Sequence, residues 1–270
     1  FSETGSSGVT LDLAEEMGVD YEVLAGLRTC CGWPQYLSGD LERGEELLLG
    51  LGKLIDKSKP KVVVSGCAEC VAAVQVLARR SGGAFESIST VEWLRRNRDK
   101  LDLAPSDNPI TFHDSCHLTR KMNRGHMARD LMDGVFEVNE IEQSGRDGQC
   151  CGYYGFDQNK EKTHELRRTR MEQAKATGAG VMAVECVTCQ ESYEKVHQEG
   201  DVKVVELQKL VLDSLRRNEH RHRPGVSSRC GGTHGHPRRR NRPAMGQAPG
   251  GNRRPSLRSP VEGRGAGGLL

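Results

Sequence analysis

Aromatic residues are scarce in this sequence, at 4% of its 270 residues, and no apolar run approaches the 18 or so residues that a membrane-spanning helix needs. We therefore expect no transmembrane segment and a core built mainly from Val, Leu and Ala. The chain starts at Phe1, with neither an initiator Met nor a basic-then-apolar leader. We therefore expect it to be an N-terminally truncated segment of a longer protein.

Lysine is absent from residues 219–270, which hold 11 Arg, 6 Pro, 11 Gly and only 2 acidic residues. This composition cannot bury enough apolar surface to offset its ordering entropy, so we expect a disordered tail that contributes Cys230 to no site. The remaining 1–218 hold 28 basic and 35 acidic residues, a net charge of −7. An acidic body gives no electrostatic reason to expect nucleic acid as a partner.

The cysteines follow a spacing that occurs twice. Each copy is a Cys-Cys-Gly followed by a Cys-x-x-Cys, and the eight cysteines are Cys30, Cys31, Cys67 and Cys70, then Cys150, Cys151, Cys186 and Cys189. The interval from the second Cys of the pair to the next motif is 36 positions in the first copy and 35 in the second. Such a repeat favours metal ligation in a reducing compartment over disulfides.

Short Val-rich strands alternate with helical patterns along both copies. We predict strands at 62–64, 85–89, 109–113, 181–184 and 202–205, and helices at 39–57, 71–80, 91–98, 158–177 and 207–217, with another helix opening at the second Cys-x-x-Cys. This alternation is typical of the α/β class with parallel strands. We predict two pseudo-symmetric modules, 1–105 and 106–218, each with short parallel strands and flanking helices.

Each Cys-x-x-Cys comes where a predicted strand ends and a helix begins. Unpaired backbone N–H groups and the helix dipole stabilise thiolates at that point. A further cysteine, Cys116, follows the strand at 109–113 and stands 34 positions before Cys150. If the strands are parallel neighbours, five thiols from three loops converge at one edge of the second module.

Five thiols exceed the four ligands of a structural zinc ion, and two adjacent thiols fit a multi-iron cluster better than one small ion. All-thiolate sites select zinc, Cu(I) or iron–sulfur groups. The second copy therefore favours an iron–sulfur cluster. The alternative is a zinc-binding protein with cysteine-rich sites and no redox role.

The pattern Cys116, Cys150-Cys151-Gly152 and Cys186-x-x-Cys189 resembles the cysteine-rich CCG domain. That domain occurs as a tandem pair in heterodisulfide reductase and in related oxidoreductases, such as the iron–sulfur subunit of glycolate oxidase. The resemblance covers about residues 10–210. It implies that Cys116, Cys150, Cys151, Cys186 and Cys189 bind a [4Fe-4S] cluster, of the noncubane type found in heterodisulfide reductase.

The same resemblance implies an electron-transfer subunit of a cytoplasmic oxidoreductase complex, with disulfide reduction as a candidate reaction. The expected partner is a ferredoxin-like iron–sulfur subunit or one that carries flavin or haem, and a membrane-bound partner is compatible with it. The sequence offers no flavin or haem site of its own, so the electrons have to come from such a partner.

The first copy departs from the five-cysteine pattern. Projecting the same offset back from Cys30 puts its leading cysteine before Phe1, and residues 1–29 contain none. Cys30, Cys31, Cys67 and Cys70 thus form an incomplete four-thiol site, for a cluster or for zinc.

Two histidines, His113 and His117, flank Cys116 of the second copy. We expect them to make hydrogen bonds rather than to ligate metal.

Overall fold

The computed structural model describes residues 6–24, 29–153 and 159–222, and Phe1–Gly225 form one compact unit. The α-helices are α1 (Ser6–Glu16), α2 (Trp33–Ser38), α3 (Leu41–Ser58), α4 (Ala68–Arg80), α5 (Thr90–Arg96), α6 (His126–Met132), α7 (Lys160–Ala176), α8 (Val187–Glu194) and α9 (Leu207–His222). The strands are β1 (Val62–Ser65), β2 (Glu86–Ser89), β3 (Thr111–His113), β4 (Val181–Val184) and β5 (Lys203–Glu206). The disordered tail was predicted from residue 219, but α9 continues to His222 because its backbone hydrogen bonding extends past the apolar pattern. The rest of the predicted tail, from residue 223 onward and with Cys230, lies outside the described residues.

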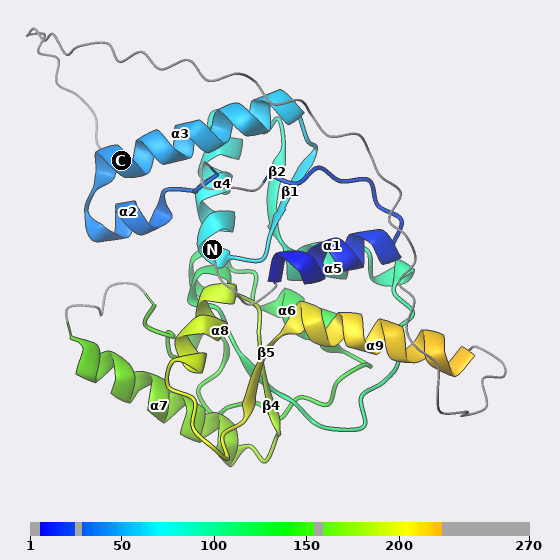
Figure 1. Cartoon of the computed structure of the whole chain (residues 1–270). Coiled ribbons are helices and arrows are strands. Elements are labelled where there is room, and N and C mark those ends of the chain that lie inside the picture. The colour runs from blue at the N-terminus through cyan, green and yellow to red at the C-terminus, as the bar shows by residue number, and fades with distance from the viewer. Residues whose placement is uncertain (1–5, 25–28, 154–158, 223–270) are drawn as a thin grey trace, which may run out of the picture. The chain divides into compact units, whose positions relative to one another are not determined.

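The strands form two small parallel sheets, one with the order β1-β2 and one with the order β3-β4-β5 (Figure 1). In the second sheet, His113 at the end of β3 pairs with Val184 at the end of β4. Parallel pairing brings the carboxyl ends of neighbouring strands to the same edge. The predicted α/β fold, with two repeats and short parallel strands, is confirmed.

The two repeats have the same order of elements. A helix, α3 or α7, precedes a strand that runs into a Cys-x-x-Cys helix, α4 or α8. A second strand then leads directly into a last helix, so that β2 continues into α5 and β5 into α9. β3 belongs to the second repeat alone, and the described residues of 1–105 contain no strand equivalent to it.

The helices that precede the two Cys-Cys-Gly turns are exchanged between the repeats. α1 of the first repeat packs against α9 of the second, and α6 of the second packs against α5 of the first (Figure 1). Leu13 of α1, Leu94 of α5, Leu131 of α6 and Val211 of α9 are all fully buried in the resulting core. Each such side chain contributes on the order of 1.5–3 kcal/mol on burial. The shared core therefore holds the repeats together.

Some elements differ from the sequence prediction. α4 begins at Ala68, three residues before the predicted start, so Cys70 lies in its first turn. α1, α2 and α6 were not predicted, and Cys116 is followed by a π-helical turn, His117–Lys121. None of the helices in the described ranges is both long and apolar enough to cross a bilayer.

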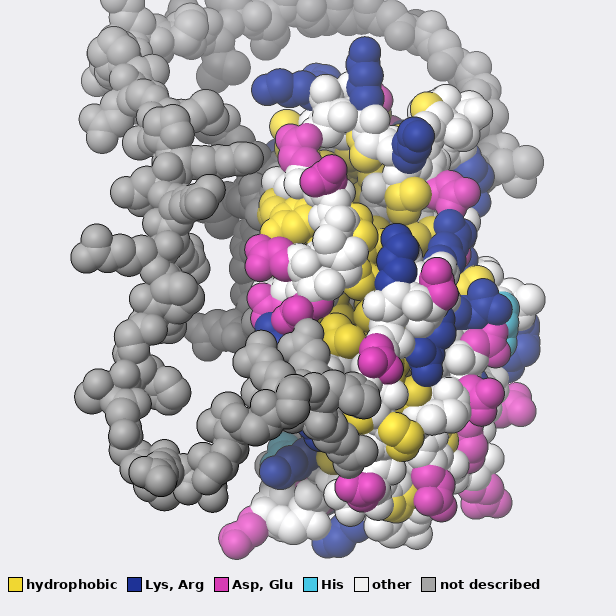
Figure 2. All heavy atoms as spheres, turned by 90° about the vertical axis from the view of Figure 1, so that its right-hand side faces the viewer, with side chains coloured by type: hydrophobic (Ala, Val, Ile, Leu, Met, Phe, Trp, Pro, Cys, Tyr) yellow, Lys and Arg dark blue, Asp and Glu magenta, His cyan; other side chains and the backbone are white. Residues whose placement is uncertain are grey.

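Acidic and basic side chains are interspersed on the face shown in Figure 2. Among the described residues, several acidic and basic side chains form exposed ion pairs, such as Arg216 with Asp12 at 3.2 Å and Arg95 with Asp130 at 2.7 Å. Exposed pairs of this kind contribute little to stability, typically about 0–1 kcal/mol. The stability of the fold therefore comes chiefly from its apolar cores.

Candidate metal centre

The two Cys-Cys-Gly turns have the same local geometry. The glycine that follows the pair has a positive φ, 75° at Gly32 and 65° at Gly152. Its N–H group donates to the sulfur two residues earlier, at 3.5 Å from Cys30 and 3.4 Å from Cys150. Glycine suits this left-handed conformation, in which other residues are strained. The glycine thus gives both turns the same shape, in which the second cysteine of each pair is buried.

The two Cys-x-x-Cys motifs meet at their helix N-termini. Cys67 caps α4 and Cys186 caps α8, each with an extended backbone. The N–H of Ala68 donates to the sulfur of Cys186 at 3.3 Å, and the N–H of Val187 donates to the carbonyl of Gly66 at 3.2 Å. These bonds cross from one repeat to the other, a contact between the repeats that the sequence did not predict.

The five cysteines predicted in the second module come together. Cys116 follows β3 and Cys186 follows β4, and these strands are parallel neighbours. The sulfurs of Cys116 and Cys150 lie 3.6 Å apart. Cys189 interacts with both Cys151 and Cys186 through its thiol. The last three thiols are buried, so metal bound here is shielded from water.

The four cysteines of the first module also cluster. The sulfurs of Cys31 and Cys70 lie 3.4 Å apart, and Cys67 interacts with both Cys70 and Cys186. Cys30 lies beside them in the turn described above. The nine predicted cysteines thus form two groups that meet at Cys67 and Cys186. Whether they ligate metal stays a prediction.

Proton sharing between these thiols shifts their pKa values. The pKa of Cys150 is lowered, chiefly by its hydrogen bond with the Cys116 thiol, and that of Cys116 is raised by the same bond. The pKa of Cys186 is also lowered, first by Cys189 and then by Cys67. Metal ligands have to be deprotonated, so a bound metal ion takes the place of these shared protons.

Glu69 and Thr188, the third residues of the two Cys-x-x-Cys motifs, lie between the two groups of thiols. The Oε2 atom of Glu69 accepts hydrogen bonds from the Cys67 thiol at 3.0 Å and from the Thr188 hydroxyl at 3.1 Å. Burial raises the pKa of this carboxyl group to about 8. The sequence alone did not lead us to predict a role for either residue, although their position inside a Cys-x-x-Cys motif could have indicated one.

Arginines hold the loops that carry the second group. Arg167 of α7 donates to the carbonyls of Cys151 and Gly152 at 2.9 and 2.8 Å. Arg129 of α6 makes a two-pronged contact with the buried carboxylate of Asp114, at 2.7 and 3.0 Å, just before Cys116. Paired charge-assisted bonds fix direction as well as distance. Both arginines thus keep their loops in place.

The two predicted histidines have different surroundings. His113 is fully buried at the end of β3, where its Nδ1 lies 3.2 Å from the Tyr193 hydroxyl. Burial lowers its pKa to about 3, so the ring is neutral. His117 lies edge-on to Trp33, with ring centroids 6.0 Å apart, and its Nδ1 lies 3.6 Å from the Glu69 carboxylate. His113 makes the hydrogen bond expected from the sequence, and the expectation that neither ring ligates metal stays a prediction.

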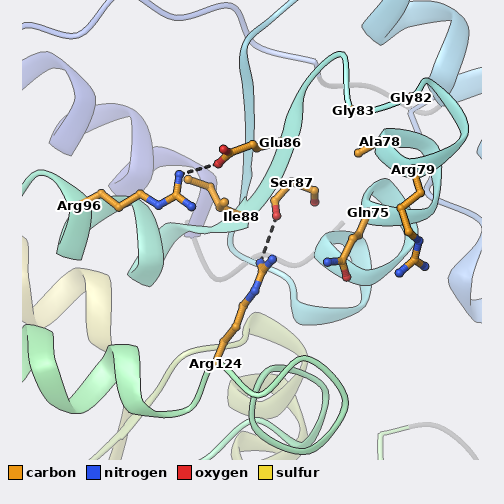
Figure 3. A pocket seen from close by; sticks show the side chains of 10 residues that line it. All are labelled: Gln75, Ala78, Arg79, Gly82, Gly83, Glu86, Ser87, Ile88, Arg96 and Arg124. Atoms are coloured by element: carbon orange, nitrogen blue, oxygen red, sulfur yellow. Dashed lines mark hydrogen bonds and ion pairs between the residues drawn. The ribbon is translucent and has the colours of Figure 1, made fainter.

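A cavity of about 500 Å³ opens elsewhere, between the carboxyl-terminal half of α4 and β2 (Figure 3). Two of the arginines that line it are already engaged. Arg96 pairs with Glu86 at 2.6 Å, and Arg124 donates to the carbonyl of Ser87 at 3.1 Å. These guanidinium groups are satisfied within the protein, so the cavity adds nothing to the thiol site.

The donor atoms where the two repeats meet fit a metal-containing group. Cys67, Glu69 and Cys186 place one sulfur, one oxygen and one sulfur atom within 4.8 Å of one another. Further thiols of both repeats flank them, and thiolate-rich sites prefer iron–sulfur clusters, zinc or Cu(I). Five thiols in the second group exceed what one tetrahedral ion needs. The arrangement fits clusters better than single ions.

Comparison with known proteins identifies both repeats. The CCG cysteine-rich domain model matches residues 5–75 and 110–192, more than half of the chain. One of the proteins that make up the fumarate reductase (CoM/CoB) of Methanothermobacter marburgensis is 26% identical over 207 residues, which cover 74% of this chain and 41% of that protein. Lactate utilization protein A from Oceanobacillus iheyensis is 25% identical over 227 residues, 78% of this chain and 91% of that protein.

A third relative belongs to the dihydromethanophenazine:CoB–CoM heterodisulfide reductase of Methanosarcina barkeri. It is 23% identical over 230 residues, which cover 80% of this chain and 56% of that protein. The chain thus spans about half the length of the two reductase proteins and nearly the whole of the lactate utilization protein.

Proposed function

Because the chain belongs to the CCG cysteine-rich domain family, we propose that it is an iron–sulfur electron-transfer subunit of an oxidoreductase complex. The observation that carries the proposal is the convergence of five thiols on three loops of the second repeat. Two of its relatives are named as parts of reductases, which supports a redox role. Zinc is the weaker candidate, because one zinc ion takes four ligands and leaves a thiol over.

The second centre would be held by Cys116, Cys150, Cys151, Cys186 and Cys189, as a [4Fe-4S] cluster of the noncubane type. Cys30, Cys31, Cys67 and Cys70 would hold the first. Such a group supplies one-electron redox chemistry when bound. The protein's own part is to orient the thiols through the Cys-Cys-Gly turns and to stabilise their negative charge at the N-termini of α4 and α8.

Disulfide reduction is the reaction we propose for the complex. One disulfide, two electrons and two protons give two thiols, so the S–S bond breaks and each sulfur gains one electron and one proton. The electrons would come from a reduced redox partner that carries a ferredoxin-like cluster, flavin or haem. One relative is named as part of a heterodisulfide reductase, which supports this choice. We also propose a cytoplasmic location, since thiols stay reduced there.

The proposal is tested by anaerobic purification, iron and acid-labile sulfide analysis, and EPR of the wild type and of Cys116→Ser. We expect equal amounts of iron and sulfide in the wild type, and a lost or altered EPR signal in the variant. Cys230→Ser, outside the repeats, is the control and should match the wild type. A colourless protein that contains zinc and no sulfide would overturn the proposal.

The disulfide reaction needs its own assay. Dithionite-reduced methyl viologen replaces the natural donor, and free thiol is counted after an asymmetric disulfide is added. We expect two thiols for each two electrons consumed, and a loss of turnover in Cys116→Ser. If iron-loaded protein oxidises no reduced viologen in the presence of any disulfide, the disulfide reaction is wrong, and the electron-transfer role stands without it.

A further inference from the structure

Glu69 lies at the point where the two repeats meet, among sulfur atoms rather than among cations. Its Oε2 atom is 3.0 Å from the sulfur of Cys67 in its own repeat and 3.5 Å from the sulfur of Cys186 in the other. Only 6% of the residue is exposed. Donor atoms around one tetrahedral ion lie about 3.3–3.8 Å apart when the bonds are about 2.0–2.3 Å long. The distance to Cys186 lies within this range and the distance to Cys67 just below it, so these donors are close enough together to bind one metal atom.

The charge of this carboxylate is not balanced by a Lys or Arg. Within the described ranges, its one ion-pair contact is with His117, at 3.6 Å. A buried carboxylate with no Lys or Arg beside it needs a metal ion to stay charged.

The two repeats differ at this position. Glu69 corresponds to Thr188, the same position of the second Cys-x-x-Cys, and the two side chains hydrogen-bond to each other. The first repeat therefore carries a carboxylate here, a common metal ligand, where the second carries a neutral hydroxyl.

We propose that the carboxylate of Glu69 is an oxygen ligand of the first iron–sulfur centre, beside Cys67 and facing Cys186. This inference rests on the proposed function, since it assumes that the four thiols of the first module bind iron. Its consequence is chemical asymmetry between the centres. One iron atom of the first centre has an oxygen ligand, while the second centre has thiolate ligands alone.

The direct test is electron–nuclear double resonance on the whole wild-type chain, grown with glutamate labelled with ¹³C at its side-chain carboxyl carbon and purified without oxygen. A ligand carboxylate gives a resolved ¹³C hyperfine coupling to the reduced first centre. We expect that coupling in the wild type and its loss in Glu69→Gln. Glu185→Gln is the matched control, because Glu185 is also buried but contacts the backbone N–H of Ser115 instead of a thiol.

A second measurement follows the release of iron to a chelator. We expect release from the first centre of Glu69→Gln to be at least about tenfold faster than in the wild type, a loss of the size seen when metal-site partners are removed. Glu185→Gln should release iron at the wild-type rate. Iron-containing wild-type protein with no ¹³C coupling would overturn this inference alone. Wild-type protein without iron would overturn the proposed function instead.

Discussion

The backbone nitrogen of Ala68 lies 3.3 Å from the sulfur of Cys186, so an N–H group of the first repeat donates to a thiol of the second. The repeats are therefore joined not only through apolar side chains but through the predicted ligands themselves. A change at the start of α4 should therefore affect the thiols of the second repeat as well.

Replacing Ala68 with proline removes this donor and puts the ring Cδ atom where the N–H pointed, so the Cys186 sulfur has to move aside. Ala68 is the first residue of α4 and follows an extended Cys67, which are the conditions that proline tolerates. Hydrogen bonds to cluster sulfurs favour the reduced state. We expect the reduction potential of the second centre to fall by about 60 mV, equivalent to about 1.4 kcal/mol for one electron. A redox titration followed by EPR measures it.

The matched control is Val187→Pro. It removes another bond across the repeats, from the Val187 N–H to the Gly66 carbonyl, puts its ring in the same place relative to the acceptor, and touches no sulfur. Its potential should stay near the wild-type value. If both variants shift the reduction potential equally, proline acts here through packing between the repeats rather than through loss of the N–H···S bond.

Gly32→Ala tests the first Cys-Cys-Gly turn. A Cβ atom at Gly32 would lie 2.2 Å from the carbonyl oxygen of Gly44, and the residue has a φ of 75°. Gly39 also has a positive φ, 89°, but a Cβ there meets nothing within 4 Å. We expect Gly39→Ala to cost about 1–2 kcal/mol from backbone strain alone. Gly32→Ala should cost at least about 2 kcal/mol more, because the backbone of α3 has to move.

Anaerobic urea denaturation compares these two glycine variants, and iron analysis shows whether the turn still assembles its site. If Gly32→Ala lowers the free energy of unfolding no more than Gly39→Ala does, the backbone of α3 moves away from the added methyl group at little energetic expense.

Arg167→Ala should loosen the second Cys-Cys-Gly turn. The guanidinium group donates to two carbonyl oxygens there, and bonds from charged donors contribute about 1.5–3 kcal/mol. We expect a loss of that size in the free energy of unfolding, together with faster release of iron to a chelator. Lys162→Ala, at an exposed position of the same helix, should change neither. Unchanged iron release in Arg167→Ala would show that the turn holds its shape unaided.

His113 should make the protein sensitive to acid. Burial lowers its pKa from 6.5 to about 3, so the folded state binds fewer protons than the unfolded state between these values. Its contribution to stability is complete above pH 6.5 and is lost progressively as the pH falls toward 3. We expect the wild type to lose about 1.4 kcal/mol per pH unit below 6.5 relative to His113→Asn, which does not titrate.

Urea denaturation of both proteins at pH 7.5, 6.5 and 5.5 measures the slope of this loss. Parallel stability profiles of the two proteins would mean that His113 has the same pKa in the folded and unfolded states.

The sequence was most informative where structure is local. The Val-rich pattern predicted β4 at 181–184 to the residue, and strand-to-helix placement put Cys67 and Cys186 at helix caps. The repeat spacing identified eight cysteines, and the strand before Cys116 added a ninth; the fold brings them into two touching groups. These features depend on neighbours in sequence, for which hydrophobic pattern and capping rules are sufficient.

Long-range packing was not predictable in the same way. Nothing in the local pattern says that α1 reaches α9 or that Cys67 meets Cys186, because such contacts depend on how the repeats dock. Glu69 looked like an ordinary acidic residue in the first turn of a helix, where acidic residues are favoured. Its buried position depends on the second repeat, which lies more than 100 residues away in sequence.

The exchange of α1 and α6 has a consequence for the order of events during synthesis. Arg216 of α9 pairs with Asp12 of α1 across 204 positions. The apolar face of α1 is therefore not fully covered until α9 has been synthesised. Contacts of such high sequence separation slow folding and lengthen the time for which aggregation-prone apolar surface is exposed. We expect nascent chains stopped before α9 to need chaperones, however well their cysteines are loaded.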